Sequence, residues 1–352
     1  MKSMSNAPTT TPFASVTGVL LIGSAPLFST AEALTQLTAA LPNRLLSIPD
    51  GETGEARRNY IDSEIKRFPR EALKPHFGGL DPPPAAGHKP ISIFTLDDVK
   101  PTEYGTVAVQ SYRTFTELRK HGVIPTGVRL QVSLPLPFAP VQVYIRAEFR
   151  EQLELLYEIR MREAVTTILS NIPADDLAIQ LDLAVEVMAL DRVERFVAGL
   201  PADVALGFHF CYGDRDHKHF IEPEDLGVVV DFANGIQGRL KRDIHWMHLP
   251  VPRDRDDEAY FEPLRRLVLR APGNEVETKL YLGIVHANDE GGTKRRIQTA
   301  SKFVERFGVA TECGLGRTPV EELDSILQIS REVSGPANCE LSKSSDYKVD
   351  SS

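Results

Sequence analysis

Eight short apolar segments, many of them rich in β-branched residues, recur along the chain and alternate with helix-like sequence. They are Val16–Ser24, Arg44–Pro49, Gly127–Leu134, Leu177–Ala184, Val204–Cys211, Asp243–Pro250, Lys279–His286 and Val309–Gly314. Strands of a parallel sheet are covered on both faces, so they read as nearly continuous apolar runs rather than as alternating ones. The pattern therefore predicts a parallel sheet whose strands alternate with helices.

Helical periodicity fills most of the intervals, with apolar residues spaced three or four positions apart. The predicted helices are Thr30–Ala40, Val107–Lys120, Arg146–Leu169, Leu190–Gly199, Phe261–Ala271, Thr293–Arg306 and Pro319–Ser334. Eight alternating units favour a (β/α)8 TIM barrel, and a doubly wound open sheet is the competing α/β arrangement. Because no domain break interrupts the units, we expect the closed barrel.

We expect a single domain over residues 16–336, with residues 1–15 and the polar tail 337–352 disordered on either side. The stretch 54–126, between the second and third apolar segments, is the main insertion in this domain. A connection of that length in a compact domain is typical of a lid or a binding element. The segment Asp214–Asn234, after the fifth apolar run, is predicted to be a second insertion.

Charge and cysteine content narrow the class of partners. The 352 residues carry a net charge of −9, so no surplus of Lys and Arg is available to follow nucleic-acid phosphates or an anionic membrane. No apolar run reaches the roughly 18 residues of a membrane span. The three cysteines make an odd count that suits a reducing compartment. We therefore expect a cytoplasmic protein that acts on small molecules.

Each apolar segment ends in, or is followed by, a polar or metal-binding side chain. In chain order these are Ser24, Asp50 and Glu52, Ser133, Asp182 and Glu186, His209 and Cys211, His248, His286, and Glu312 and Cys313. In a barrel of this type the carboxyl ends of the strands converge on the active site. Stability alone does not explain this distribution, so we interpret it as a functional site.

Two of the three cysteines stand at these strand ends. His209 and Cys211 are two residues apart, so their side chains leave a strand on the same face. Zinc favours nitrogen and sulfur ligands, and its catalytic sites keep one position open. A lone cysteine at a strand end is more often a small buried hydrophobic residue. The paired spacing and the glycine beside Cys313 nevertheless favour a Zn²⁺ site made of His209, Cys211 and Cys313.

Five motifs occur in the order seen in cobalamin-independent methionine synthase: Leu21-Ile22-Gly23-Ser24, Gly51-Glu52, Gln180-Leu181-Asp182, His209-Phe210-Cys211 and Glu312-Cys313-Gly314-Leu315. From about residue 16 to residue 334 the chain resembles the C-terminal catalytic barrel of that family, in a single-barrel form. The superfamily also includes uroporphyrinogen decarboxylase. The pairing of the HxC triplet with the late Cys-Gly-Leu is fairly specific, whereas the other motifs are weak when taken singly.

The resemblance implies a chemistry and a set of site residues. It implies that a small thiol substrate binds zinc, becomes a thiolate and attacks a methyl group carried by a donor. Ser24, Glu52 and Asp182 would hold the substrate, and Glu52 and Asp182 are also the candidate catalytic residues. Further candidates for substrate binding are Glu186, Arg57 and Arg317.

The chain departs from the family at two places. The family has a glutamate ligand at the end of the sixth strand, whereas the segment Asp243–Pro250 contains no glutamate. We predict that His248 replaces it as a fourth ligand, in a His₂Cys₂ shell that zinc tolerates. The second departure follows Asp182, where Leu183-Ala184-Val185 replaces an acidic residue and proline. The thiol substrate therefore need not be homocysteine.

Three functions remain open at this stage. The favoured one is a zinc-dependent transferase that activates a small thiol for methyl or alkyl transfer. The second is a lyase or decarboxylase-type barrel that acts on an acidic small molecule without metal-thiolate chemistry, using Arg57, Arg58 and Arg317. The third is a non-catalytic barrel that only binds zinc.

Overall fold

The computed structural model describes residues 13, 15–54, 57, 63–77, 93–184, 189–215, 218–219, 222–270, 273–274 and 276–337. Within these residues, eight parallel strands form one sheet. The strands are β1 (Val16–Leu20), β2 (Ser47–Pro49), β3 (Arg129–Pro135), β4 (Leu177–Ala184), β5 (Ala205–Cys211), β8 (Trp246–Pro250), β9 (Lys279–Val285) and β10 (Phe307–Thr311). All eight predicted strand positions are confirmed.

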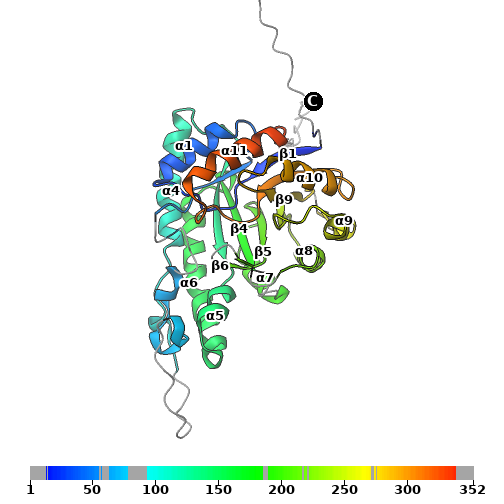
Figure 1. Ribbon diagram of the computed structural model, residues 1–352. Helices are drawn as coiled ribbons and strands as arrows, with labels where there is room; N and C mark the ends of the chain where they lie inside the picture. The colour runs from blue at the N-terminus through cyan, green and yellow to red at the C-terminus, as the bar shows by residue number, and fades with distance from the viewer. Residues whose placement is uncertain are drawn as a thin grey trace, which may run out of the picture.

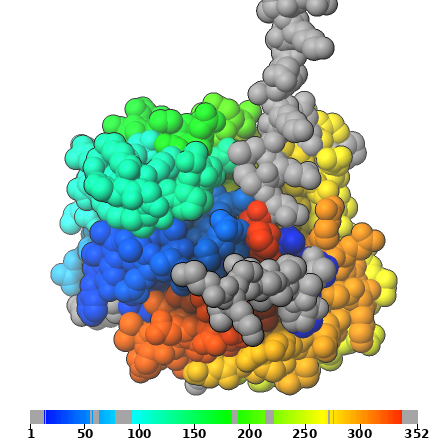
Figure 2. Space-filling model, turned by 90° about the horizontal axis from the view of Figure 1, so that it is seen from above, coloured from blue at the N-terminus to red at the C-terminus, as the bar shows by residue number. Residues whose placement is uncertain are grey.

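The sheet curls on itself as a TIM barrel does. Its strand order is β1-β10-β9-β8-β5-β4-β3-β2, so neighbours in the sheet are neighbours along the chain. The two strands at the ends of this order meet through a parallel bridge between Ser24 and Gly51, and Val19 N donates to Arg44 O at 2.9 Å. Seen from one end, successive parts of the chain follow one another around the molecule (Figure 2). The barrel is therefore confirmed over the open sheet.

Helices surround the strands (Figure 1). They are α1 (Thr30–Ala40), α4 (Tyr104–Lys120), α5 (Phe138–Tyr144), α6 (Arg150–Asn171), α7 (Leu190–Val197), α8 (Gly227–Arg239), α9 (Glu258–Phe261), α10 (Glu290–Ala300) and α11 (Val320–Val333). Helix α1 begins after Ser29, whose side chain accepts a hydrogen bond from Glu32 N and so satisfies one free amide of the first turn. None of the described helices has both the length and the apolarity needed to cross a bilayer.

The predicted second insertion contains the start of a barrel helix. Helix α8 begins at Gly227, inside the segment 214–234 that we expected to be an insertion, and a short hairpin of β6 (Asp214–Arg215) and β7 (Lys218–His219) precedes it. Glycine disfavours helix, and the glycines of α8 hid it from the sequence pattern. A Cβ at Gly235 would lie 2.8 Å from Leu190 Cδ1, so this glycine lets α8 approach α7 closely.

The long connection after β2 packs against α6. Its described part contains the 3₁₀ turns η1 (Ile65–Arg67), η2 (Arg70–Ala72), η3 (Pro75–Phe77) and η4 (Leu96–Asp98), followed by α4. Arg160 on α6 donates to the carbonyls of Val99 and Leu96 at 2.8 and 3.0 Å. Tyr157 donates to Glu64 at 2.8 Å in the interior. These bonds fix the described part of the insertion to the barrel.

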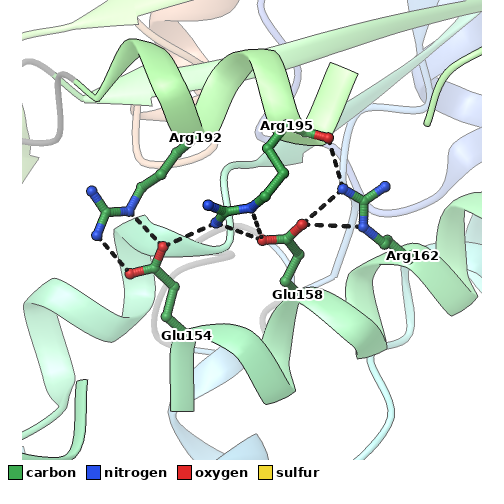
Figure 3. A network of polar contacts seen from close by, with 5 residues as sticks. All are labelled: Glu154, Glu158, Arg162, Arg192 and Arg195. Atoms are coloured by element: carbon green, nitrogen blue, oxygen red, sulfur yellow. Dashed lines mark hydrogen bonds and ion pairs between the residues drawn. The ribbon is translucent and has the colours of Figure 1, made fainter. Parts of the chain in front are cut away.

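Helix α6 buries carboxylates on the face that meets α7 (Figure 3). Glu154 and Glu158 are only 5% and 7% exposed. Arg195 from α7 donates to both, and Arg192 donates to Glu154. Ile159, an apolar residue of the same helix, is 44% exposed. Charge pairing therefore joins these two helices.

Candidate metal centre and the carboxyl groups beside it

Three metal-binding side chains meet at the mouth of the barrel. His209 and Cys211 lie on β5, and Cys313 follows β10, which two other strands separate from β5 in the sheet. The three ligand atoms lie within 4.8 Å of one another. Cys211 Sγ is 3.9 Å from Cys313 Sγ, which in turn is 3.8 Å from His209 Nε2. The barrel thus brings together residues that are about a hundred positions apart.

Two of the three distances between these ligand atoms fit a tetrahedral zinc ion, and the third, between Cys211 and His209, is at most 4.8 Å. Bonds of about 2.3 Å to sulfur and about 2.0 Å to nitrogen would place two sulfurs about 3.8 Å apart and a sulfur and a nitrogen about 3.5 Å apart. The distances in the structure, 3.9 and 3.8 Å, differ from these values by a few tenths of an ångström. Three protein ligands would leave a fourth position open, as in catalytic zinc sites.

The electrostatic surroundings shift the pKa values of two of these ligands in opposite directions. The pKa of Cys313 lies well below its usual range, and the hydrogen bond with Cys211 lowers it most. Burial raises this pKa, but His209 and Arg317 lower it further. Burial lowers the pKa of His209, but its hydrogen bond and charge interaction with Cys313, together with Asp182, raise it overall. The thiolate is the form of cysteine that binds metals.

His248, predicted as the fourth ligand, is not brought into this group. Its side chain is completely buried on β8, beside His209 on β5. Its Nδ1 atom lies 2.8 Å from Nδ1 of His209, and its Nε2 atom lies 3.0 Å from the carbonyl oxygen of Thr311. Both ring nitrogens of His248 therefore contact protein atoms.

Asp182 lies beside the metal-binding group on β4, where it pairs in register with His209. Burial raises the pKa of Asp182 to about 7, although His209 and a hydrogen bond from Gln180 act in the opposite direction. Gln180 Nε2 donates to Asp182 Oδ1 at 2.9 Å. A carboxyl group with such a pKa exchanges a proton near neutral pH.

Glu52 is the second carboxyl group at this end of the barrel. Burial raises its pKa well above the usual range, and the charges of Asp182 and Asp50 raise it further. Its backbone is left-handed, with φ of 44°. A Cβ at Gly23 would come within 3.1 Å of Glu52 Oε1, so the glycine makes room for this carboxyl group.

Ser24 supports the turn that carries Cys313. Its hydroxyl accepts a hydrogen bond from Gly316 N at 3.0 Å, and its carbonyl accepts one from Leu315 N at 2.8 Å. A Cβ at Gly314 would lie 2.6 Å from Ser24 Oγ, which explains the glycine after the cysteine. Arg317, in the same turn, lies close enough for its charge to lower the pKa of Cys313.

Arg57 pairs with a carboxylate at the edge of the same region. It donates to Asp50 Oδ2 at 2.9 Å, and Ser111 donates to the same oxygen at 2.6 Å. Asp50, Glu52, Arg57 and Ser133 are among the residues that line a pocket between β2, β3 and α4. Arg57 thus stands at the edge of this pocket, with its charge balanced by Asp50.

Two other candidates stand apart from this arrangement. Glu186 lies outside the described residues. His286, at the end of β9, contacts the carbonyl oxygen of Val251 at 3.0 Å instead of the metal-binding group. Burial lowers the pKa of His286 to about 4, and the nearby Arg296 lowers it too, so this histidine is neutral at pH 7.

A comparison with solved structures supports the fold. No family model matches the chain, and no curated protein matches it. The chain is similar to a B12-independent methionine synthase from Shewanella sp. W3-18-1, in complex with selenomethionine, with a TM-score of 0.52. The identity is 15%, and the match covers 91% of this chain and 95% of that one. At this identity the likeness establishes a shared TIM-barrel-like fold.

A buried amide network beneath the site was not predicted from the sequence. Gln180 Nε2 donates to Ile22 O at 2.7 Å, and Gln131 Nε2 donates to Leu21 O at 2.9 Å, across the inside of the barrel. Ser47 donates to Gln131 Oε1 at 2.8 Å. The sequence did contain a signal for this network. Gln131 and Gln180 each lie two residues before the polar residue near the end of an otherwise apolar strand. Residues two positions apart lie on the same face of a strand.

Proposed function

We propose that this protein is a zinc-dependent transferase that activates a small thiol substrate for methyl or alkyl transfer. The observation that carries the proposal is the convergence of His209 Nε2 and the sulfurs of Cys211 and Cys313 within 4.8 Å at the barrel mouth. The fold shared with a B12-independent methionine synthase supports it. The selenomethionine bound by that protein supports a small-molecule substrate.

The ligand set suits thiol activation. A bound zinc ion would supply the positive charge that keeps a substrate thiol deprotonated at neutral pH. One neutral imidazole and two thiolates balance the charge of a divalent ion and leave one position for the substrate. His209, Cys211 and Cys313 would thus hold the ion and orient the thiol toward the methyl donor.

The two carboxyl groups would act on the rest of the substrate. Asp182, with a pKa of about 7, would accept the proton of the substrate thiol. Glu52 and Asp182, when ionised, would also hold a cationic group of the substrate. Because Glu52 sits on a left-handed turn and Asp182 on a barrel strand, the two carboxyl groups approach the centre from different elements.

Metal analysis of cysteine variants tests this proposal. We expect about one zinc ion per chain in the wild type and its loss in Cys211→Ser and Cys313→Ser, because each variant removes one of three ligands. Cys339→Ser is the matched control, since this third cysteine is remote in sequence from the predicted ligands. Wild-type protein without stoichiometric metal after exposure to excess zinc would contradict the proposal. Turnover that survives both ligand substitutions would favour the metal-independent lyase.

A further inference from the structure

We propose that His248 is a positioning residue that fixes the tautomer of His209 and the turn carrying Cys313, instead of a fourth metal ligand. The inference rests on the proposed function, because it concerns how the chain prepares the same centre. It follows from two contacts, between the two imidazole rings and between His248 and Thr311, and from the glycine on β9 that leaves room for the second contact.

Hydrogen-bond direction decides the tautomers. The carbonyl oxygen of Thr311 can only accept, so His248 Nε2, 3.0 Å away, carries a hydrogen and donates it. A neutral imidazole has one such hydrogen, which leaves His248 Nδ1 as an acceptor. Nδ1 of His209, at 2.8 Å, must then be the donor. In the neutral form of His209, which is the form that binds a metal, the remaining nitrogen, Nε2, keeps its lone pair, and this atom faces the sulfur of Cys313.

Strand β9 is shaped to let His248 make this contact. Gly283 lies between the imidazole and the end of β10, and a Cβ there would come within 2.8 Å of His248 Nε2 and 3.0 Å of Thr311 O. Any larger residue at this position would push the ring away from the carbonyl. The lack of a side chain at Gly283 therefore lets the His248 ring approach the carbonyl oxygen of Thr311 closely.

The contact with Thr311 also reaches a second ligand. Thr311 is the last residue of β10, two positions before Cys313, and its hydroxyl donates to the carbonyl of Cys313 at 2.8 Å. His248 thus holds His209 through one ring nitrogen and the start of the cysteine turn through the other. Partners of this kind orient metal ligands and strengthen binding, typically by about 10–100-fold.

Two substitutions separate positioning from ligation. In His248→Gln, the amide oxygen can accept from His209 Nδ1 and the amide nitrogen can donate to Thr311 O, which preserves the direction of both bonds. In His248→Leu, both bonds are lost while an apolar side chain fills the space. We expect the leucine variant to bind zinc about 10–100-fold more weakly in chelator competition. The glutamine variant should recover most of that loss.

The cobalt-substituted proteins supply a second measurement. Wild type and His248→Gln should share the same visible absorption bands, and added thiol should shift the bands of both. A glutamine variant with different bands, together with wild-type bands that do not respond to thiol, would make His248 a ligand and overturn the proposal. Thermal unfolding of each metal-free variant identifies any loss of binding that comes from misfolding.

Nitrogen-15 NMR of the histidine rings in metal-free protein tests the tautomers independently of metal binding. We expect a hydrogen on Nε2 and none on Nδ1 of His248. A hydrogen on Nδ1 of His248 would refute the inference even if zinc binds. If the protein binds no zinc but His248 has the expected tautomer, the proposed function is wrong. The inferred hydrogen bonds from His209 to His248 and from His248 to Thr311 are then still supported.

Discussion

Glu52 combines a left-handed backbone with a buried carboxyl group. Residues with a side chain seldom adopt φ near 44°, and such a conformation costs on the order of 1–3 kcal/mol. Asp50 Oδ1 accepts a hydrogen bond from Glu52 N at 2.8 Å and helps to hold the turn. Strained residues that persist in this way cluster at functional sites, which agrees with a role for Glu52 in binding substrate.

We expect Glu52→Gln to stabilise the metal-free protein at pH 8 by about 1 kcal/mol or more. Burial, Asp182 and Asp50 raise the pKa of Glu52, so ionisation of this carboxyl group at high pH costs stability. The gain should shrink as the pH falls toward the ordinary pKa of glutamate, about 4.3, where the wild-type side chain is protonated. Urea unfolding at pH 8 and pH 5 measures the difference.

Glu305→Gln, at an exposed position, is the control for this prediction. Its stability should match that of the wild type at both pH values. An unchanged or lower stability of Glu52→Gln at pH 8 would contradict the electrostatic account of the site. The same substitution is expected to weaken substrate binding, which would show that the carboxyl group is kept for function.

The sequence predicted the cluster of His209, Cys211 and Cys313 but not the contacts of His248. The spacing of His209 and Cys211 fixes their shared face on a strand, and this is why the pair could be predicted. Which ring nitrogen of His248 faces which neighbour depends on the side-chain orientation and on the close approach that Gly283 permits. Neither can be predicted from the sequence around His248, because both depend on residues of other strands.

At the scale of elements, strands were easier to predict than helices. Buried parallel strands leave a distinct apolar signal, and all eight were located. Helices α5 and α8 were missed because Pro140 lies within α5 and three glycines lie within α8. In both cases packing against the barrel outweighs a weak intrinsic preference for helix.

The ion-pair network between α6 and α7 predicts a specific loss of stability. Glu158→Gln should destabilise the protein at pH 7 by about 1–3 kcal/mol, because it weakens charged hydrogen bonds to Arg195 and Arg162. Glu163→Gln is the control, since Glu163 is half exposed and its pair with Arg160 should contribute less than about 1 kcal/mol. Denaturant unfolding of the two variants gives the comparison.

The pH dependence of this effect has a defined sign. Although burial raises the pKa of Glu158, hydrogen bonds from Arg195 and Arg162 lower it overall. The stabilisation is therefore present above the unfolded-state pKa of about 4.3 and is lost as the pH falls through the lower folded-state value. Equal losses of unfolding free energy in Glu158→Gln and Glu163→Gln at pH 7 would contradict the claim that the ion-pair network between α6 and α7 adds stability.

At the scale of the whole molecule, barrel closure creates the site. Strands β5 and β10 are separated by β8 and β9 in the sheet, so their ends meet only because the sheet curls. The alternating pattern predicted the barrel, and the barrel in turn predicted that polar strand ends would converge. The packing of the insertion after β2 against α6 was not predictable, since it depends on side-chain bonds between distant segments.

The central claim is that a metal held by His209, Cys211 and Cys313 activates a thiol. It is tested most directly by titrating the cobalt-substituted protein with homocysteine and other small thiols, with homoserine as the hydroxyl control. We predict a saturable change in the sulfur-to-cobalt absorption when a thiol is added, and no change with homoserine. Cobalt-loaded protein whose spectrum is unaffected by every thiol would contradict the claim and favour a barrel that only binds metal.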